Sequence, residues 1–151
     1  MFSIKQLVFK DILTVNKLEI ESGKIYCLFG ESGSGKSTLL KMFNSMLTPD
    51  QGTITYKGQS IANLDPVQLR REVVMLGQDP IVFEGTVRDN LLIGLQYAGE
   101  ADVEDQVLID LLKDLHLTKD LDEEADKLSG GEQQRLGFGR VLLINAEVDL
   151  L

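Results

Sequence analysis

The 151-residue sequence predicts an α/β fold with a parallel central sheet. Three observations lead to this prediction. Segments with strand-like alternation come first, an apolar stretch then runs into a glycine-rich loop and an amphipathic helix, and helical periodicity dominates from Thr86 onward. The composition agrees, because 43% hydrophobic and 26% charged residues are ordinary for a globular domain that buries a core.

The predicted strands lie mainly in the first half of the chain. FSIKQLVF (2–9) and LTVNKLEI (13–20) alternate between apolar and polar residues, and ESGK after them is typical of a turn. IYCLF (25–29) is apolar throughout, which predicts a strand buried on both faces with Cys27 as a buried small hydrophobe. TITYKG (53–58) predicts a further short strand.

The predicted helices follow the glycine-rich loop and then fill the second half. STLLKMFNSML (37–47) has helical spacing and is ended by TPDQG, and a short helix over 66–72 precedes the buried strand VVML. TVRDNLLIGL (86–95) and VEDQVLIDLLKDLHL (103–117) both carry apolar residues three and four apart, and a last helix starts near Gly131.

The charge of the chain is concentrated in one stretch. The net charge is −9, and residues 99–126 hold eleven Asp or Glu against two Lys. An acidic protein is a poor nucleic-acid binder, so we expect no nucleic-acid partner. The acidic stretch favours a solvated helical face, with a cation site as the alternative. Without a signal peptide or a membrane-spanning run, we expect a cytoplasmic protein.

The segment GESGSGKS, from Gly30 to Ser37, fits the pattern G-x-x-x-x-G-K-[ST] between a predicted buried strand and a predicted helix. Its glycines let backbone N–H groups point inward at an anion, and the helix N-terminus adds partial positive charge. Lys36 then supplies a charge for the β- and γ-phosphates, and the Ser37 hydroxyl is a ligand for Mg²⁺. The alternative is a flexible Gly/Ser turn before a helix.

A second motif, LSGGEQQR, occupies Leu128 to Arg135. Ser129 with Glu132 three residues later predicts a capping box at a helix start. Gly130 and Gly131 reduce helix stability, which makes sense if an anion approaches the N–H groups there closely.

With these two motifs the chain resembles the ATP-binding cassette family, the nucleotide-binding subunits of ABC transporters. LSGGEQQR matches the family signature, GESGSGKST matches its Walker A loop, and Gln78 stands where the family has its Q-loop glutamine. The resemblance implies a P-loop NTPase core with an N-terminal antiparallel β subdomain and an inserted helical signature subdomain. The core would take residues 1–77 and 146–151, and the helical subdomain 78–145.

The resemblance also implies a role for each matching residue. ATP would be held by Gly30, Glu31, Ser32, Gly33, Ser34, Gly35, Lys36, Ser37 and Thr38. Mg²⁺ would be bound by Ser37 and Gln78, and Gln78 would also position water. The γ-phosphate would be capped in trans, in a head-to-tail dimer, by Ser129, Gly130, Gly131 and Gln133 of a second cassette. Phe9 is the candidate for stacking on adenine.

The family resemblance implies the ATP-binding subunit of a transporter, held at the inner face of the cell membrane by a transmembrane permease subunit. The region from Gln78 to about Leu95 would receive a helix of that subunit, and its apolar run PIVF (80–83) either faces that groove or belongs to the subdomain core. The alternatives are a non-transport cassette, as in DNA maintenance or translation factors, and a nucleotide-binding fragment without enzymatic role.

Two departures from the family pattern remain. Gly137 and Gly139 stand inside the last predicted helix, where each costs about 1 kcal/mol relative to Ala. The chain ends in VDLL, which resembles the start of the family's Walker B strand, before the acidic residues of that motif. The only histidine, His116, precedes the signature motif, whereas the family's switch histidine follows it. His116 is thus expected at a surface or helix end. We therefore expect Mg²⁺–ATP binding without efficient hydrolysis, and self-association through an open edge at 25–29.

Overall fold

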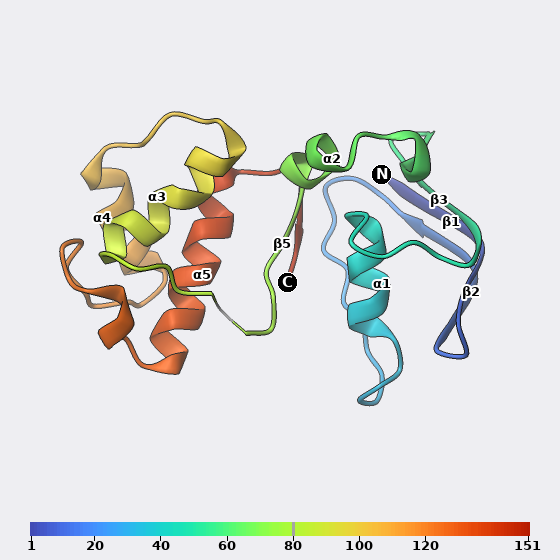
Figure 1. The fold of residues 1–151 in the computed structure, drawn as a ribbon, viewed down its shortest axis with the longest axis horizontal. Helices are drawn as coiled ribbons and strands as arrows, with labels where there is room; N and C mark the ends of the chain where they lie inside the picture. Colours follow the sequence, from blue (N-terminus) through green and yellow to red (C-terminus); the bar gives the residue numbers. More distant parts are fainter. Residues whose placement is uncertain (80) are drawn as a thin grey trace. The chain divides into compact units, whose positions relative to one another are not determined.

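The computed structural model describes residues 1–79 and 81–151, so Pro80 of the PIVF run lies outside the described residues. The chain divides into two compact units, Met1–Met75 and Leu76–Leu151 (Figure 1). The two predicted subdomains, 1–77 with 146–151 and 78–145, remain a prediction.

An antiparallel sheet forms the first unit, with strand order β2-β1-β3-β4. The strands are β1 (Phe2–Phe9), β2 (Leu13–Ile20), β3 (Gln51–Tyr56) and β4 (Gln59–Ser60). The central strand β1 places Ile4 opposite Leu18 on one side and opposite Ile54 on the other. This sheet confirms the predicted strands 2–9 and 13–20 and the short strand at 53–58.

The helices of the first unit are α1 (Lys36–Phe43), a 3₁₀ turn (Ile61–Asn63) and α2 (Pro66–Glu72), which is followed by β5 (Val73–Met75). The core forms where α1 meets the sheet, and its least exposed side chains include Ile4, Leu7, Met42, Phe43 and Ile54. The Phe2 ring joins them, with its centroid 4.6 Å from that of Phe43.

Helix α1 ends at Phe43, whereas the sequence predicts a helix that continues to Leu47. Asn44 caps the helix and Ser45 takes a left-handed conformation, with φ 56°. Arg70 of α2 donates hydrogen bonds to the carbonyls of Asn44 (3.2 Å) and Ser45 (2.9 Å). These tertiary contacts stabilise the open turn at the helix end in place of another helical turn.

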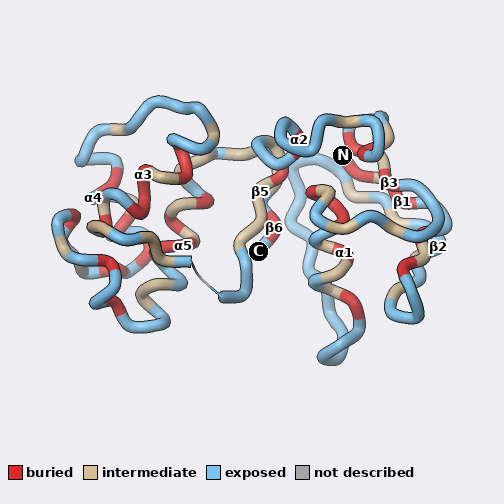
Figure 2. The backbone as a smooth tube through the Cα atoms, in the orientation of Figure 1, coloured by how far each residue is buried: buried red, intermediate tan, exposed pale blue. Residues whose placement is uncertain are grey.

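The predicted buried strand at 25–29 is wrong, and so is the predicted burial of Cys27. Ile25 is 95% exposed and Phe29 is 91% exposed, and Figure 2 colours most of the segment between β2 and α1 as exposed. A strand exists only through hydrogen bonds to a neighbour, and β1, β2, β3 and β4 pair among themselves, all antiparallel. In the described part of the first unit no strand pairs with residues 25–29, so the predicted parallel sheet does not form around them.

Helices dominate the second unit: α3 (Val87–Ala98), α4 (Asp105–Asp114), a 3₁₀ turn (Ala125–Lys127) and α5 (Gly130–Ile144), followed by the strand β6 (Val148–Leu150). These elements confirm the predicted helices. A core cluster joins all three helices, and its fully buried members include Val87, Leu91, Leu108, Ala125 and Leu136. His116 is exposed just after α4, as the sequence predicts. Within the described ranges, none of the helices has the length and apolar character that crossing a membrane requires.

Gly139 stands inside α5 because α3 and α4 approach that helix closely. A Cβ atom at this position would lie 2.8 Å from Leu115 Cδ1 and 3.1 Å from Leu91 Cδ2. Gly94 on α3 faces Arg140 in the same way, with a Cβ at 2.7 Å from Arg140 Cγ. The lower helix propensity of Gly139 is therefore offset by close packing of the helices.

Candidate functional site

The predicted phosphate loop folds around the ammonium group of Lys36. This group donates hydrogen bonds to the carbonyls of Gly30 (2.8 Å) and Glu31 (2.7 Å), and Ser34 Oγ lies 3.4 Å away. The Ser34 amide donates to the Glu31 carbonyl at 3.3 Å, which closes the turn. The loop thus brings together four of the predicted residues, with a cation at their centre.

Helix α1 begins at this loop with its first turn open to a ligand. Its N-cap is Gly35, with φ 86°, and no side chain caps the helix. Helix α2, by contrast, is capped by Asp65, whose carboxylate accepts from Val67 and Gln68, each at 2.9 Å. The first amides of a helix lack intrahelical acceptors and carry partial positive charge, so the open end of α1 suits an anion.

Two glycines of the loop stand where a side chain would be crowded, and Gly35 is also held in a left-handed conformation. A Cβ on Gly30 would lie 2.8 Å from Ser34 Oγ, and a Cβ on Gly35 would lie 3.3 Å from Leu13 Cδ1. Glu31, Ser32, Gly33 and Ser37 are exposed, and Thr38 is half-buried in the first turn of α1. The Ser37 hydroxyl therefore stands at the open helix end, where a phosphate-bound Mg²⁺ would need a ligand.

Phe9 ends β1 with only 8% of its surface exposed, and the Lys10 ammonium lies 5.1 Å from the centre of its ring. A ring that is mostly covered offers little face for stacking on a base. Adenine stacking by Phe9 remains a prediction, and its burial weighs against it.

Gln78 lies in an exposed segment of the second unit. Its main-chain carbonyl accepts from Gln134 Nε2 of α5 at 3.5 Å, a long contact. The predicted roles of Gln78 with Mg²⁺ and water remain predictions.

The predicted capping box at the start of α5 is confirmed. Ser129 donates both its amide (2.7 Å) and its hydroxyl (2.8 Å) to Glu132 Oε2. Gly130 and Gly131 are exposed, and a Cβ on Gly130 would meet nothing within 4 Å. Gln133 turns inward, since its Nε2 donates to the Leu128 carbonyl at 3.1 Å. Gly130 and Gly131 thus leave the helix N-terminus accessible, whereas the amide and hydroxyl of Ser129 and the side-chain amide of Gln133 already have acceptors.

Two interactions beside these motifs were not predicted from the sequence. The buried Asn90 of α3 donates to the carbonyls of Phe83 (2.9 Å) and Thr86 (3.0 Å), and Arg140 of α5 donates to the Asn90 carbonyl at 2.7 Å. Near the signature loop, the Lys119 ammonium lies 3.0 Å from Glu123 Oε1 and 3.6 Å from Glu132 Oε1. Arg140 and Asn90 are 50 residues apart in the chain, and Lys119 lies outside the signature motif that contains Glu132.

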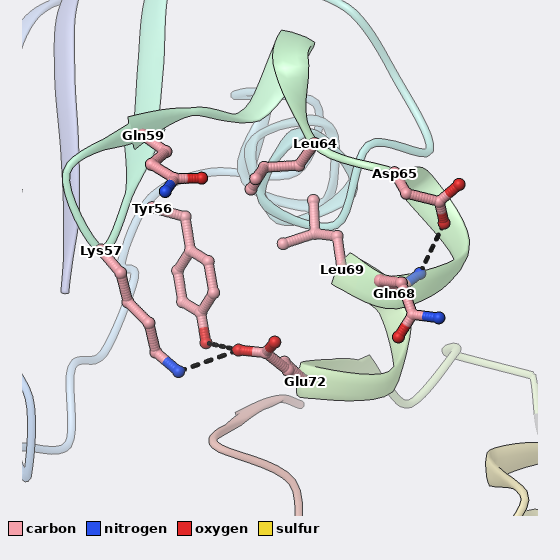
Figure 3. A pocket seen from close by; sticks show the side chains of 8 residues that line it. All are labelled: Tyr56, Lys57, Gln59, Leu64, Asp65, Gln68, Leu69 and Glu72. Carbon is pink, nitrogen blue, oxygen red and sulfur yellow. Dashed lines mark hydrogen bonds and ion pairs between the residues drawn. The ribbon is translucent and has the colours of Figure 1, made fainter.

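A pocket in the first unit holds none of the predicted site residues. Figure 3 shows the Glu72 carboxylate between the Tyr56 hydroxyl (3.0 Å) and the Lys57 ammonium (2.8 Å). The hydrogen bond from Lys57, and then that from Tyr56, hold the pKa of Glu72 below its ordinary value. Burial, with the Glu72 carboxylate second, raises the pKa of Tyr56. These polar groups bind one another and tie the β3–β4 hairpin to α2, so the pocket is a structural contact.

Comparison with known proteins agrees with the two motifs. The family model for ABC transporters matches residues 13–151. A lactococcin transport/processing ATP-binding protein of Lactococcus lactis is 35% identical over 94% of this chain and 21% of that protein. The glycine betaine/proline betaine transport system ATP-binding protein ProV of Escherichia coli is 34% identical over 89% of this chain and 35% of that protein.

Solved structures show the same fold. The structure of a bacterial Atm1-family ABC exporter with ATP bound matches with a TM-score of 0.84 at 27% identity, over 96% of this chain and 28% of that chain. The chain therefore spans about a third or less of the length of these three proteins.

Proposed function

The chain belongs to the ABC transporter family, and we propose that it binds ATP with Mg²⁺ as part of the ATP-binding subunit of a transporter. The loop from Gly30 to Ser37, with Thr38, holds the phosphates. The family consists of ATPases, and ATP hydrolysis by the assembled transporter is part of this proposal.

The observation that carries the proposal is the position of the Lys36 ammonium, within 3 Å of two loop carbonyls at an uncapped helix start. A cation held inside a loop, next to an uncapped helix start, favours a multiply charged anion, and a nucleoside triphosphate supplies one. Bound Mg²⁺ neutralises part of the phosphate charge, with Ser37 and Gln78 as its proposed protein ligands.

The signature loop completes the proposed site from a second copy. Gly130 and Gly131 offer exposed helix-start amides to the γ-phosphate bound by the other cassette, in a head-to-tail dimer, and Ser129 adds its hydroxyl only if that hydroxyl leaves Glu132. Gln133 acts there only if it leaves the Leu128 carbonyl. A transmembrane permease is the proposed second partner, and it would hold the chain at the inner face of the membrane.

Calorimetric titration of ATP into the 151-residue chain tests the function. Lys36→Ala removes the side-chain charge on the phosphates, and we expect affinity to fall by about tenfold or more. Lys41→Ala removes the same charge from an exposed position on the same helix and should leave the affinity within about twofold. Equal ATP affinity in the Lys36→Ala and unaltered chains would show that this loop is not the site.

A further inference from the structure

A carboxylate stands in the first turn of α5, where the proposed function places a phosphate. Glu132 accepts both the amide and the hydroxyl of Ser129 on its Oε2 atom. Two anions at one helix start repel each other, and the Ser129 hydroxyl cannot donate its single proton to both. An anion-binding signature loop with Glu at this position therefore needs a compensating cation.

The structure supplies that cation in Lys119, ten residues before Ser129. Its ammonium lies 3.6 Å from Glu132 Oε1, the oxygen that Ser129 does not use, and 3.0 Å from Glu123 Oε1. The Lys119 and Glu132 side chains are only 21% and 24% exposed, so solvent screens their interaction less than it screens a surface pair.

The pKa shifts agree with this geometry. The hydrogen bonds from the amide and then the hydroxyl of Ser129, with the Lys119 charge beside them, hold the pKa of Glu132 below its ordinary value. The Glu123 carboxylate raises the pKa of Lys119. Both groups are therefore charged at neutral pH, and Lys119 holds Glu132 from the side away from Ser129.

We propose that Lys119 is a positioning residue of the signature loop, which holds Glu132 and offsets part of its charge so that the exposed amides of Gly130 and Gly131 accept a polyphosphate. The proposal rests on the proposed function and names a residue outside the motif. Loss of Lys119 removes the positive charge that Glu123 and Glu132 share, so both carboxylates act in full on the incoming phosphate.

The test uses the 151-residue chain with Lys36→Ala, which removes the main cation of the other phosphate loop. Sodium tripolyphosphate is titrated while the amide resonances of Gly130 and Gly131 are followed by NMR. We expect saturable shifts, about three- to fivefold weaker binding in Lys119→Met, and recovery to within about twofold in Lys119→Arg. Lys113→Met, which removes a surface charge from α4 where Lys113 pairs with Asp110, is the matched control.

The interaction between the two residues is measured in the Glu132→Gln background. Because a neutral amide needs no compensation, Lys119→Met should have little effect there. If Lys119→Met weakens tripolyphosphate binding equally in the Glu132 and the Glu132→Gln proteins, Lys119 acts on the anion directly and not through Glu132, which would overturn the proposal. Absence of saturable shifts, or unchanged affinity in Lys119→Met, would overturn the proposal too. Failure of the proposed function is detected separately by calorimetry, as equal ATP affinity in the Lys36→Ala and unaltered chains.

Discussion

The guanidinium carbon of Arg140 on α5 lies 4.8 Å from the centre of the Phe83 ring, in the segment that follows Gln78. The same guanidinium donates to the carbonyls of Asn90 (2.7 Å) and Ile81 (3.1 Å) and to Asn90 Oδ1 (3.1 Å). Burial lowers the pKa of Arg140, which remains charged at any physiological pH. This one side chain thus anchors the segment 81–83 to the helix that begins with the signature motif.

Replacement of Arg140 by Met should destabilise the second unit by about 2 to 3 kcal/mol, because Met keeps the apolar stem and helix propensity but removes the charged donor from the carbonyl and Oδ1 of the buried Asn90. Urea unfolding followed by circular dichroism measures the loss. Arg135→Met, at an exposed position of the same helix, should stay within about 0.5 kcal/mol. A loss of equal size in both variants would show that the carbonyl contacts contribute nothing specific.

Gly52 and Gly58 provide a matched pair for the backbone of the first unit, since both have left-handed φ angles, 87° and 83°. A Cβ on Gly52 would lie 2.6 Å from Leu7 Cα, where the register of β1 against β3 shifts between Lys5 and Val8, whereas a Cβ on Gly58 would meet nothing within 4 Å. We expect Gly58→Ala to cost about 1 kcal/mol and Gly52→Ala about 3 kcal/mol or more in thermal or urea unfolding. Equal losses of unfolding free energy in the two variants would mean that β1 and β3 move apart easily at this register shift.

Local signals in the sequence predicted most of the elements and both loops. Ser129 with Glu132 and the glycines of GESGSGKS each act within a few residues, so the start of α5 and the loop before α1 follow from the sequence. The stretch 25–29 was predicted wrongly because an apolar run specifies burial only when another strand lies beside it.

The missed contacts have the same physical origin. Arg140 and Asn90 are 50 residues apart in the sequence, and Lys119 lies outside the motif that contains Glu132. Neither spacing corresponds to a helical or strand period, so neither contact can be predicted from the local sequence. A faint signal existed for Arg140, since a charged residue within the apolar run LGFGRVLL must find a buried partner. Nothing comparable distinguishes Lys119 from the other lysines.

Glu72 should make the stability of the first unit depend on acid pH. Its pKa lies below the ordinary value of 4.5, so its contribution is fully present above that pH and is lost as the pH falls through the lowered value. Because the side chain is 45% exposed, we expect Glu72→Gln to cost less than about 1 kcal/mol at pH 7. The difference between the two proteins should shrink as urea unfolding is repeated towards about pH 3. The exposed Glu100→Gln serves as control, and a difference that grows on acidification would contradict the assignment.

Ile81 and Val82 separate the two interpretations of the run PIVF, as a permease groove or as subdomain core. Val82 is partly buried and packs against the core cluster of the second unit, whereas the neighbouring Ile81 is 67% exposed. An aspartate at Val82 would place a charge at the edge of an apolar core, and we expect a loss of about 2 kcal/mol or more in unfolding experiments.

An aspartate at Ile81 should leave the fold intact, because the side chain is exposed and the hydrogen bond to Arg140 is made by the main-chain carbonyl. If this surface receives the proposed transmembrane partner, Ile81→Asp should lower co-purification with the permease without changing the unfolding midpoint. The exposed Val107→Asp on α4 is the control for adding a charge elsewhere on the same unit. Normal co-purification of Ile81→Asp would remove this face from the proposed interface, and a stable Val82→Asp would show that Val82 does not belong to the core.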